Sequence, residues 1–146
     1  EITTRLVGSE MCIRDRFGEA IGLTVCYDMR FPELYQALSQ TCTLIINIAN
    51  WPDKRRDHWQ TLLKARSIEC QSFIAGCNRC GSGNGLNYSG DSAVYSPWGE
   101  EAAKAEPYKE QLIYAEINGK VCREAREIFP VKQDRKLELY RDFYAK

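Results

Sequence analysis

The chain has 146 residues, of which 44% are apolar and 27% are charged, and its 20 basic side chains balance 20 acidic ones. This composition is typical of a globular domain with a core and excludes an intrinsically disordered chain. The balanced charge argues against a dedicated nucleic-acid-binding protein, which needs an excess of Lys and Arg to neutralise phosphates.

Apolar runs and turn residues predict strands that alternate with helices. Residues 20–26 are a nearly continuous, β-branched apolar run, which is typical of a strand buried on both faces. Pro32 favours the first turn of a helix, which we expect over residues 32–40. The later predicted elements are strand 43–48, helix 56–71, strand 72–78, a glycine-rich loop over 81–90, strands 92–95 and 111–117, helix 118–129 and a charged, aromatic tail over 131–146. This alternation indicates the α/β class, and the best apolar run is far too short to cross a membrane.

The helix expected over residues 56–71 places charge on its apolar stripe. The stripe begins at Trp59 and Leu62, and helical spacing continues it to Arg66 and Glu69. A charge that points inward is unfavourable unless it is paired. We therefore expect an inward Arg66–Glu69 ion pair whose role is structural rather than catalytic.

Seven cysteines, an odd number, lie mostly within strand-like or helix-like runs. This pattern argues against a disulfide framework and indicates a reducing cytoplasm in which most thiols are small buried groups. Cys77 and Cys80 form a C-x-x-C pair, but no second pair accompanies it and His58 is the only histidine. Because a zinc site needs about four ligands, we expect no metal site.

Cys26 differs from the other cysteines in its position. It ends the first predicted strand, where open α/β sheets place catalytic groups, and a sharp turn follows it. A thiolate there can act as a nucleophile when positive charge stabilises it, and the backbone N–H of Tyr27 can face an oxyanion. Position alone leaves open a core cysteine in a non-catalytic binding or structural module.

Four more residues near the strand ends are candidates for the site. Asp28 and Arg30 lie on the turn after Cys26, where they could pair to brace it or one could contact a substrate. Asn50 and Trp51 follow the second predicted strand and are expected to line a pocket, although Trp51 could equally serve in packing.

Residues 22–34 read Gly-Leu-Thr-Val-Cys-Tyr-Asp-Met-Arg-Phe-Pro-Glu-Leu, which resembles the nucleophile motif of the nitrilase (carbon–nitrogen hydrolase) superfamily. Further motifs follow in that family's order and spacing: Asn47-Ile-Ala-Asn50-Trp51-Pro52, Arg66-Ser-Ile-Glu69, Asn78-Arg79, Gly90-Asp91-Ser92 and Ser96-Pro97-Trp98-Gly99. Residues 50–59 and 83–92 are most similar to the omega-amidase branch. The resemblance covers residues 17 to about 140.

The resemblance implies a four-layer α-β-β-α sandwich, of which this chain supplies half, and a Glu-Lys-Cys catalytic set without metal or organic cofactor. The implied substrates are small ω-amides of 2-oxo dicarboxylates, which lose ammonia through a cysteine thioester. Another nitrilase branch, acting on deaminated glutathione or N-carbamoyl compounds, is the alternative. Family members commonly form dimers, often through the helix after the cysteine and the C-terminal tail, which makes Leu139 and Tyr140 expected contacts.

Of the catalytic set only Cys26 has a counterpart here. The family's Glu and Lys precede the cysteine motif, but no Lys precedes Cys26, and Glu1, Glu10 and Glu19 lack the matching context. We therefore expect residues 17–146 to be a C-terminal half that is inactive and prone to aggregate alone.

Residues 11–16 read Met-Cys-Ile-Arg-Asp-Arg, which is the literal translation of ATG-TGT-ATA-AGA-GAC-AG plus a purine. This nucleotide string resembles a transposon-end adapter. We therefore expect residues 1–16 to be a foreign lead-in joined to the hydrolase sequence.

Overall fold

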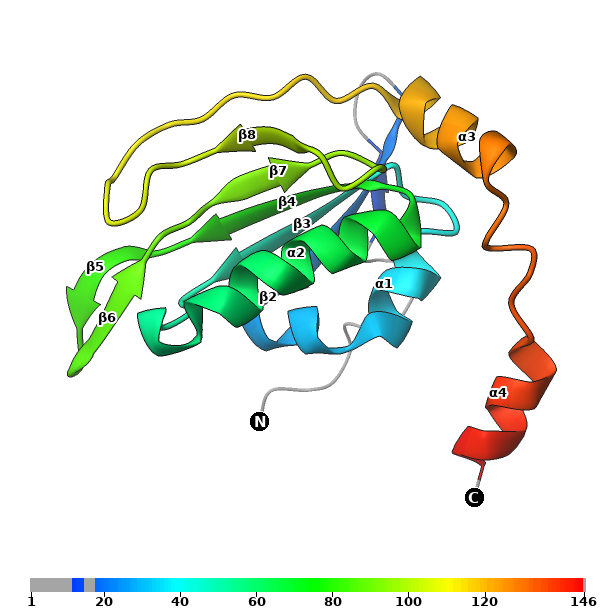
Figure 1. The fold of residues 1–146 in the computed structure, drawn as a ribbon, viewed down its shortest axis with the longest axis horizontal. Coiled ribbons are helices and arrows are strands. Elements are labelled where there is room, and N and C mark those ends of the chain that lie inside the picture. Colours follow the sequence, from blue (N-terminus) through cyan, green and yellow to red (C-terminus); the bar gives the residue numbers. More distant parts are fainter. Residues whose placement is uncertain (1–11, 15–17, 146) are drawn as a thin grey trace.

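The computed structural model describes residues 12–14 and 18–145, which form a six-stranded mixed sheet with helices packed on it (Figure 1). In sheet order the strands are β1 (Cys12–Arg14), β2 (Ala20–Val25), β3 (Leu44–Ala49), β4 (Phe73–Asn78), β7 (Ala93–Tyr95) and β8 (Glu101–Lys104). Strands β2, β3 and β4 are parallel, and the remaining pairings are antiparallel. The fold is α/β, as the sequence predicted.

The three parallel strands end level with one another. Val25 of β2 pairs with Ile48 of β3, and Ile48 lies opposite Cys77 of β4. The segments that follow these strands therefore meet at one edge of the sheet, where open α/β sheets place their ligand sites. Cys26 follows β2 at this edge, and Asn50 follows β3 directly.

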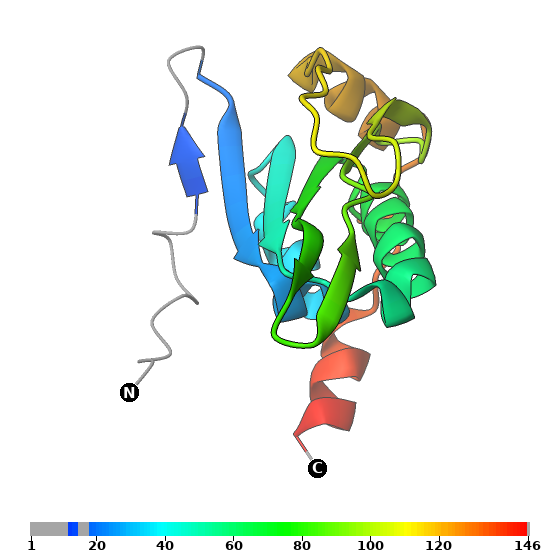
Figure 2. The same ribbon diagram turned by 90° about the vertical axis from the view of Figure 1, so that its left-hand side faces the viewer.

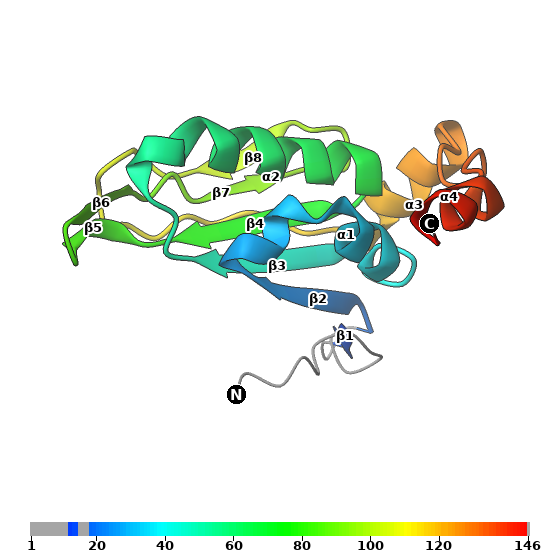
Figure 3. The ribbon, with the colours of Figure 1, turned by 90° about the horizontal axis from the view of Figure 1, so that it is seen from below.

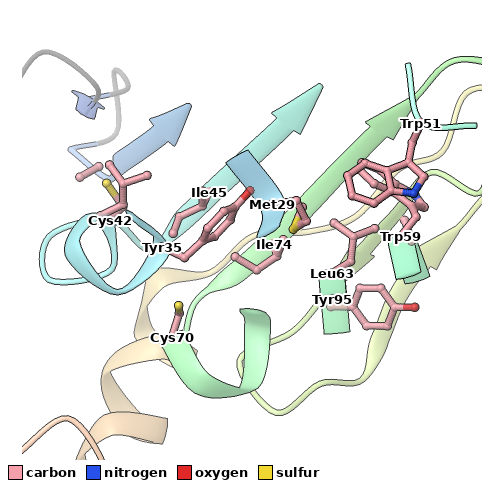
Figure 4. Close-up of a cluster of buried hydrophobic side chains, with 13 residues drawn as sticks. Met29, Tyr35, Cys42, Ile45, Trp51, Trp59, Leu63, Cys70, Ile74 and Tyr95 are labelled. Atoms are coloured by element: carbon pink, nitrogen blue, oxygen red, sulfur yellow. The ribbon is translucent and has the colours of Figure 1, made fainter. Parts of the chain in front are cut away.

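Helices α1 (Pro32–Leu38) and α2 (Arg56–Cys70) lie on the same side of β2, β3 and β4 (Figure 3). Proline at the start of α1 presets the backbone for a first helical turn. Gly76 of β4 lets α2 approach closely, since a Cβ there would lie 2.6 Å from Leu63 and 2.7 Å from Trp59. The buried side chains between helices and sheet (Figure 4) include Met29, Tyr35, Ile45, Trp59, Leu63 and Ile74.

The opposite face of the sheet is partly open in the described part of the chain. Leu23, Val25 and Ile48 are 41%, 50% and 56% exposed, although the alternate positions of the same strands are buried. The expectation that the strand at residues 20–26 is buried on both faces is therefore wrong for these residues, because α1 and α2 cover only one face.

The glycine-rich segment predicted as a loop is a hairpin of two strands, β5 (Cys80–Gly83) and β6 (Leu86–Ser89). Its turn is Asn84–Gly85, with φ of 55° and 72°. Asn-Gly is the dipeptide that two-residue hairpin turns favour, because both positions need positive φ. The high glycine content of residues 81–90 favours a loop prediction, although the Asn-Gly pair within them indicates a hairpin turn.

The strand predicted over residues 111–117 is also wrong. These residues have no regular secondary structure, and Leu112 and Tyr114 are 82% and 83% exposed. The segment has the apolar composition of a strand, but no described strand pairs with it. Strand β8, which the sequence did not predict, pairs with β7 instead.

Two helices complete the chain. Helix α3 (Gly119–Ile128) matches its prediction, and the Asn118 side chain accepts the Lys120 N–H at 3.0 Å as an N-cap. Helix α4 (Leu137–Tyr144) forms within the predicted tail and lies apart from the sheet in two views (Figures 1 and 2). It buries none of its residues, and Leu139 and Tyr140 are exposed. No helix in the described ranges is long and apolar enough to span a membrane.

A buried polar cluster joins α1 to the parallel strands. The Tyr35 hydroxyl lies 2.7 Å from Thr24 Oγ1 and accepts a hydrogen bond from Asn47 Nδ2 at 3.1 Å. Asn47 Nδ2 also donates to Thr24 Oγ1 at 2.9 Å. Burial raises the pKa of Tyr35 to about 12, and these hydrogen bonds only partly oppose that rise.

We expect this cluster to make the fold sensitive to alkali. The unfolded chain releases the Tyr35 proton near its ordinary pKa of 10.0, whereas the folded chain keeps it until about 12. The free energy of unfolding should therefore fall as pH rises through this window, by at most about 1.4 kcal/mol per pH unit for one group. Burial also raises the pKa of Cys70 from 9.0 to about 12. Cys70 therefore adds a second decrease in the free energy of unfolding, which begins at a lower pH than that of Tyr35.

The measurement is urea unfolding at a series of pH values from 9 to 12 for the unchanged chain and for Tyr35→Phe. Both proteins carry Cys70, so the difference between their slopes above pH 10 isolates Tyr35. Equal slopes in the two proteins would contradict the expectation.

Candidate active site

A sharp strand-to-helix turn places Cys26 at the carboxyl end of β2. Cys26 begins a 3-10 helix (Cys26–Arg30), and its φ of 44° lies in the left-handed region that residues with a side chain rarely adopt. Such strain persists only where the surrounding structure imposes it, and it concentrates at functional sites. The adjacent Tyr27 N–H stands in the first turn of the 3-10 helix, where backbone N–H groups have no partner within the helix.

Asp28 braces this turn through the backbone. Its Oδ2 accepts the Val25 N–H at 2.8 Å, which ties the end of β2 to the first turn of the 3-10 helix. The ion pairs found in the described ranges do not join Asp28 to Arg30, so the bracing comes from this backbone contact.

The expected Arg66–Glu69 ion pair is present, with 2.7 Å between Nη1 and Oε1. Arg66 is buried and also donates from Nε and Nη2 to the Met29 carbonyl at 3.1 and 2.9 Å. Met29 belongs to the 3-10 helix that begins at Cys26. Helix α2 therefore anchors the 3-10 helix that begins at Cys26 through the buried guanidinium of Arg66.

Arg30 is held against aromatic and imidazole groups. Its guanidinium carbon lies 4.8 Å from the centre of the Trp51 ring, and Nη2 lies 3.3 Å from His58 Nδ1. A guanidinium over an indole face is an attractive cation–π contact. His58 lies on α2, is exposed and contacts Arg30.

Asn78, at the end of β4, fixes the segment that follows β3. Its Oδ1 accepts the Trp51 N–H at 2.7 Å, and its Nδ2 donates to the carbonyls of Trp51 and Gly90 at 3.2 and 2.8 Å. The Trp51 indole in turn donates to the Arg55 carbonyl at 2.8 Å. Sequence reasoning placed Asn78 in a family motif but gave it no role, and these bonds make it a positioning residue.

These segments enclose a cavity of about 500 Å³, within the usual range for small-molecule sites. Its lining residues are Cys26, Tyr27, Arg30, Asn50, Trp51, Pro52, Arg55, Leu86 and Tyr88. Four of the expected residues, Tyr27, Arg30, Asn50 and Trp51, thus line the cavity with Cys26, while Asp28, Arg66 and Glu69 do not. Pro52, Arg55, Leu86 and Tyr88 were not expected in the lining, and for the last two the Asn-Gly turn of the hairpin was the available signal.

Cys26 also differs chemically from the buried thiols. Burial raises the pKa of Cys70 to about 12, and burial likewise raises the pKa of Cys122, so both stay protonated and unreactive near neutral pH. Cys26 is partly exposed and lines the cavity. Within residues 12–14 and 18–145, no three His, Cys, Asp or Glu side chains gather as a metal site.

Comparison with known sequences links this geometry to hydrolases. The family profile described as Carbon-nitrogen hydrolase matches residues 4–127, so the match begins within the segment for which the sequence predicted a foreign lead-in. The omega-amidase YafV of Escherichia coli K12 is 50% identical over 111 residues, which are 75% of this chain and 43% of that protein. The 2-oxoglutaramate amidase of Paenarthrobacter nicotinovorans is 40% identical over 82% of this chain and 40% of that protein.

Solved structures match in the same way. The NitFhit protein of C. elegans superposes with a TM-score of 0.81 and 31% identity, covering 91% of this chain and 33% of that one. XC1258 of Xanthomonas campestris, described as a CN-hydrolase superfamily protein, superposes with a TM-score of 0.77 and is 35% identical, covering 86% of this chain and 49% of that one. The chain thus spans half or less of the length of these relatives.

Proposed function

The chain belongs to the carbon-nitrogen hydrolase family, and we propose that it carries the cysteine nucleophile of an amidase that acts on a small ω-amide such as 2-oxoglutaramate. The observation that carries the proposal is Cys26 itself, held at a φ of 44° on a braced turn and lining a cavity with Asn50 and Trp51. The relatives named omega-amidase and 2-oxoglutaramate amidase support this substrate class.

The proposed reaction begins when the Cys26 thiolate attacks the amide carbon. The Tyr27 N–H donates to the oxyanion of the tetrahedral intermediate. The carbon–nitrogen bond then breaks, the nitrogen takes up a proton and leaves as ammonia, and a thioester remains on Cys26. Water attacks the thioester, which releases the carboxylic acid and restores the thiol.

The proton transfers in this scheme need an acid–base group that the cavity lining lacks, since its only ionisable side chains besides Cys26 are two tyrosines and two arginines. We assign this role to the Glu and Lys of the family's catalytic set, supplied by the rest of a longer protein. The same rest of the sandwich would cover Leu23, Val25 and Ile48 on the open face of the sheet.

The experiment measures ammonia release by the longer protein and by the 146-residue chain. We expect the longer protein to hydrolyse 2-oxoglutaramate and the present chain to show no turnover, because the thiol alone lacks proton transfer. Deaminated glutathione and an N-carbamoyl amino acid are the comparison substrates. Preference for either one would favour another nitrilase branch, and turnover by the 146-residue chain would overturn the proposed division of the catalytic set.

A further inference from the structure

The cavity at Cys26 is electropositive. Two of its nine lining residues, Arg30 and Arg55, carry guanidinium groups, and none of the nine is acidic. The three carboxylates nearest in sequence are placed differently, since Asp28 accepts the Val25 N–H, and Asp53 and Asp57 are both absent from the lining. A cavity with this charge balance favours an anionic ligand.

The two guanidiniums differ in how they are held. Arg30 is packed over Trp51 and contacts His58. Arg55 ends a short 3-10 helix (Asp53–Arg55), and its carbonyl accepts the Trp51 indole N–H, which fixes its backbone at the cavity rim. The ion pairs found in the described ranges leave the Arg55 side chain without a carboxylate partner, and the residue is exposed.

The other cationic side chains near Arg55 either bind other groups of the protein or lie outside the cavity lining. Arg56 forms a bidentate contact with Asp91, with distances of 2.7 and 2.8 Å. Arg79 lies over the Tyr88 ring at 4.7 Å and donates to the Ser82 carbonyl at 3.1 Å. Lys54 is exposed on the same 3-10 helix as Arg55 but does not line the cavity. Of the two guanidiniums that line the cavity, Arg55 is the one whose side chain makes no ion pair, hydrogen bond or ring contact with the described residues, so it is the one placed to bind a ligand.

We propose that Arg55 determines specificity in the Cys26 cavity by binding the carboxylate of the substrate at the end remote from the amide. This deepens the proposed function and rests on it, because a 2-oxo dicarboxylate monoamide carries one carboxylate and one amide. A guanidinium presents paired N–H donors that match a carboxylate bidentately. With the carboxylate on Arg55, the amide carbon is directed toward Cys26.

Alkylation of Cys26 tests the subsite without any turnover. Iodoacetate and iodoacetamide react alike: the thiolate sulfur bonds to the methylene carbon, and iodide leaves. They differ in that only iodoacetate carries a carboxylate. Because both reagents need the same thiolate, the ratio of their rates at Cys26 reports recognition of the carboxylate and not the thiolate population. Cys77, which is exposed outside this cavity, is the reference thiol in the same chain.

In the 146-residue chain we expect the iodoacetate-to-iodoacetamide ratio at Cys26, measured by peptide mass mapping, to exceed that at Cys77 by roughly tenfold at low salt. Arg55→Gln should lower the ratio most of the way to that of Cys77, since Arg30 is then the one cation left in the lining, whereas the matched control Lys54→Gln should leave the ratio unchanged. Arg55→Lys should retain part of the preference, and added salt should weaken it. An unchanged ratio in Arg55→Gln, or an equal fall in Lys54→Gln, would overturn the proposal.

A kinetic arm in the longer protein separates this proposal from the proposed function. Arg55→Gln should raise KM for 2-oxoglutaramate roughly tenfold more than for a neutral amide of similar length, with little change in kcat for the neutral amide. Failure of the longer protein to hydrolyse any amide would contradict the proposed function but leave the alkylation result standing. Equal increases in KM for both substrates would contradict the role of Arg55 and would leave the proposed function standing.

Discussion

Replacing Cys26 with glycine is expected to stabilise the fold while abolishing amide hydrolysis by the longer protein. Cys26 has a φ of 44°, and the left-handed region is unfavourable by about 1–2 kcal/mol for a residue with a Cβ. Glycine adopts this conformation without that penalty. Because the partly buried thiol contributes some packing that glycine lacks, we expect a net gain of about 1 kcal/mol.

Cys26→Ala separates the two effects. Alanine removes the thiol and keeps the Cβ, so the strain remains and stability should fall slightly below that of the unchanged chain. Urea unfolding of the three proteins should therefore rank glycine first, cysteine second and alanine last. Ammonia release should be lost in both variants and retained in Cys77→Ala. Activity in either Cys26 variant, or a glycine variant less stable than the alanine variant, would contradict the assignment of a strained nucleophile.

The part of the fold that positions Cys26 could be predicted from the sequence because its signals are local. The apolar runs over β2, β3 and β4, together with Pro32, predict strands joined by helices, which α/β folds arrange in parallel. Parallel strands bring their carboxyl ends to one edge, so Cys26, Asn50 and Trp51 were expected around one pocket before any distance was known. The structure places all three on the same cavity.

The remaining cavity wall depends on long-range contacts, because the Asn-Gly turn indicates the hairpin but not the element against which the hairpin packs. Leu86 and Tyr88 reach the cavity because the hairpin of β5 and β6 folds back toward the 3-10 helix that ends at Arg55. The apolar composition of residues 111–117 predicts a strand, but a strand needs a partner, and none of the described strands pairs with this segment. Likewise, the apolar run at residues 20–26 has the composition of a strand covered on both sides, while the described helices cover one.

Replacing Arg66 with methionine is expected to destabilise the fold by about 3 kcal/mol and to loosen the turn that carries Cys26. Methionine preserves much of the side-chain volume but removes both hydrogen bonds to the Met29 carbonyl. Met29 is fully buried, so its carbonyl would be left in a region that water does not readily reach. The two lost hydrogen bonds are to the backbone of the 3-10 helix that begins at Cys26, so this helix should open more readily.

The matched control is Glu69→Gln. The Glu69 side chain is 34% exposed, so its ion pair with Arg66 is partly screened and its loss should reduce stability by about 1 kcal/mol or less. Arg66 keeps its bonds to Met29 in this variant. Urea unfolding gives the stability of each protein, and amide hydrogen exchange over residues 26–30 reports local opening of the turn. We expect faster exchange in Arg66→Met only. Equally fast exchange in both variants would show that the ion pair, and not the bond to Met29, holds the cysteine turn, and unchanged exchange in both would contradict either role.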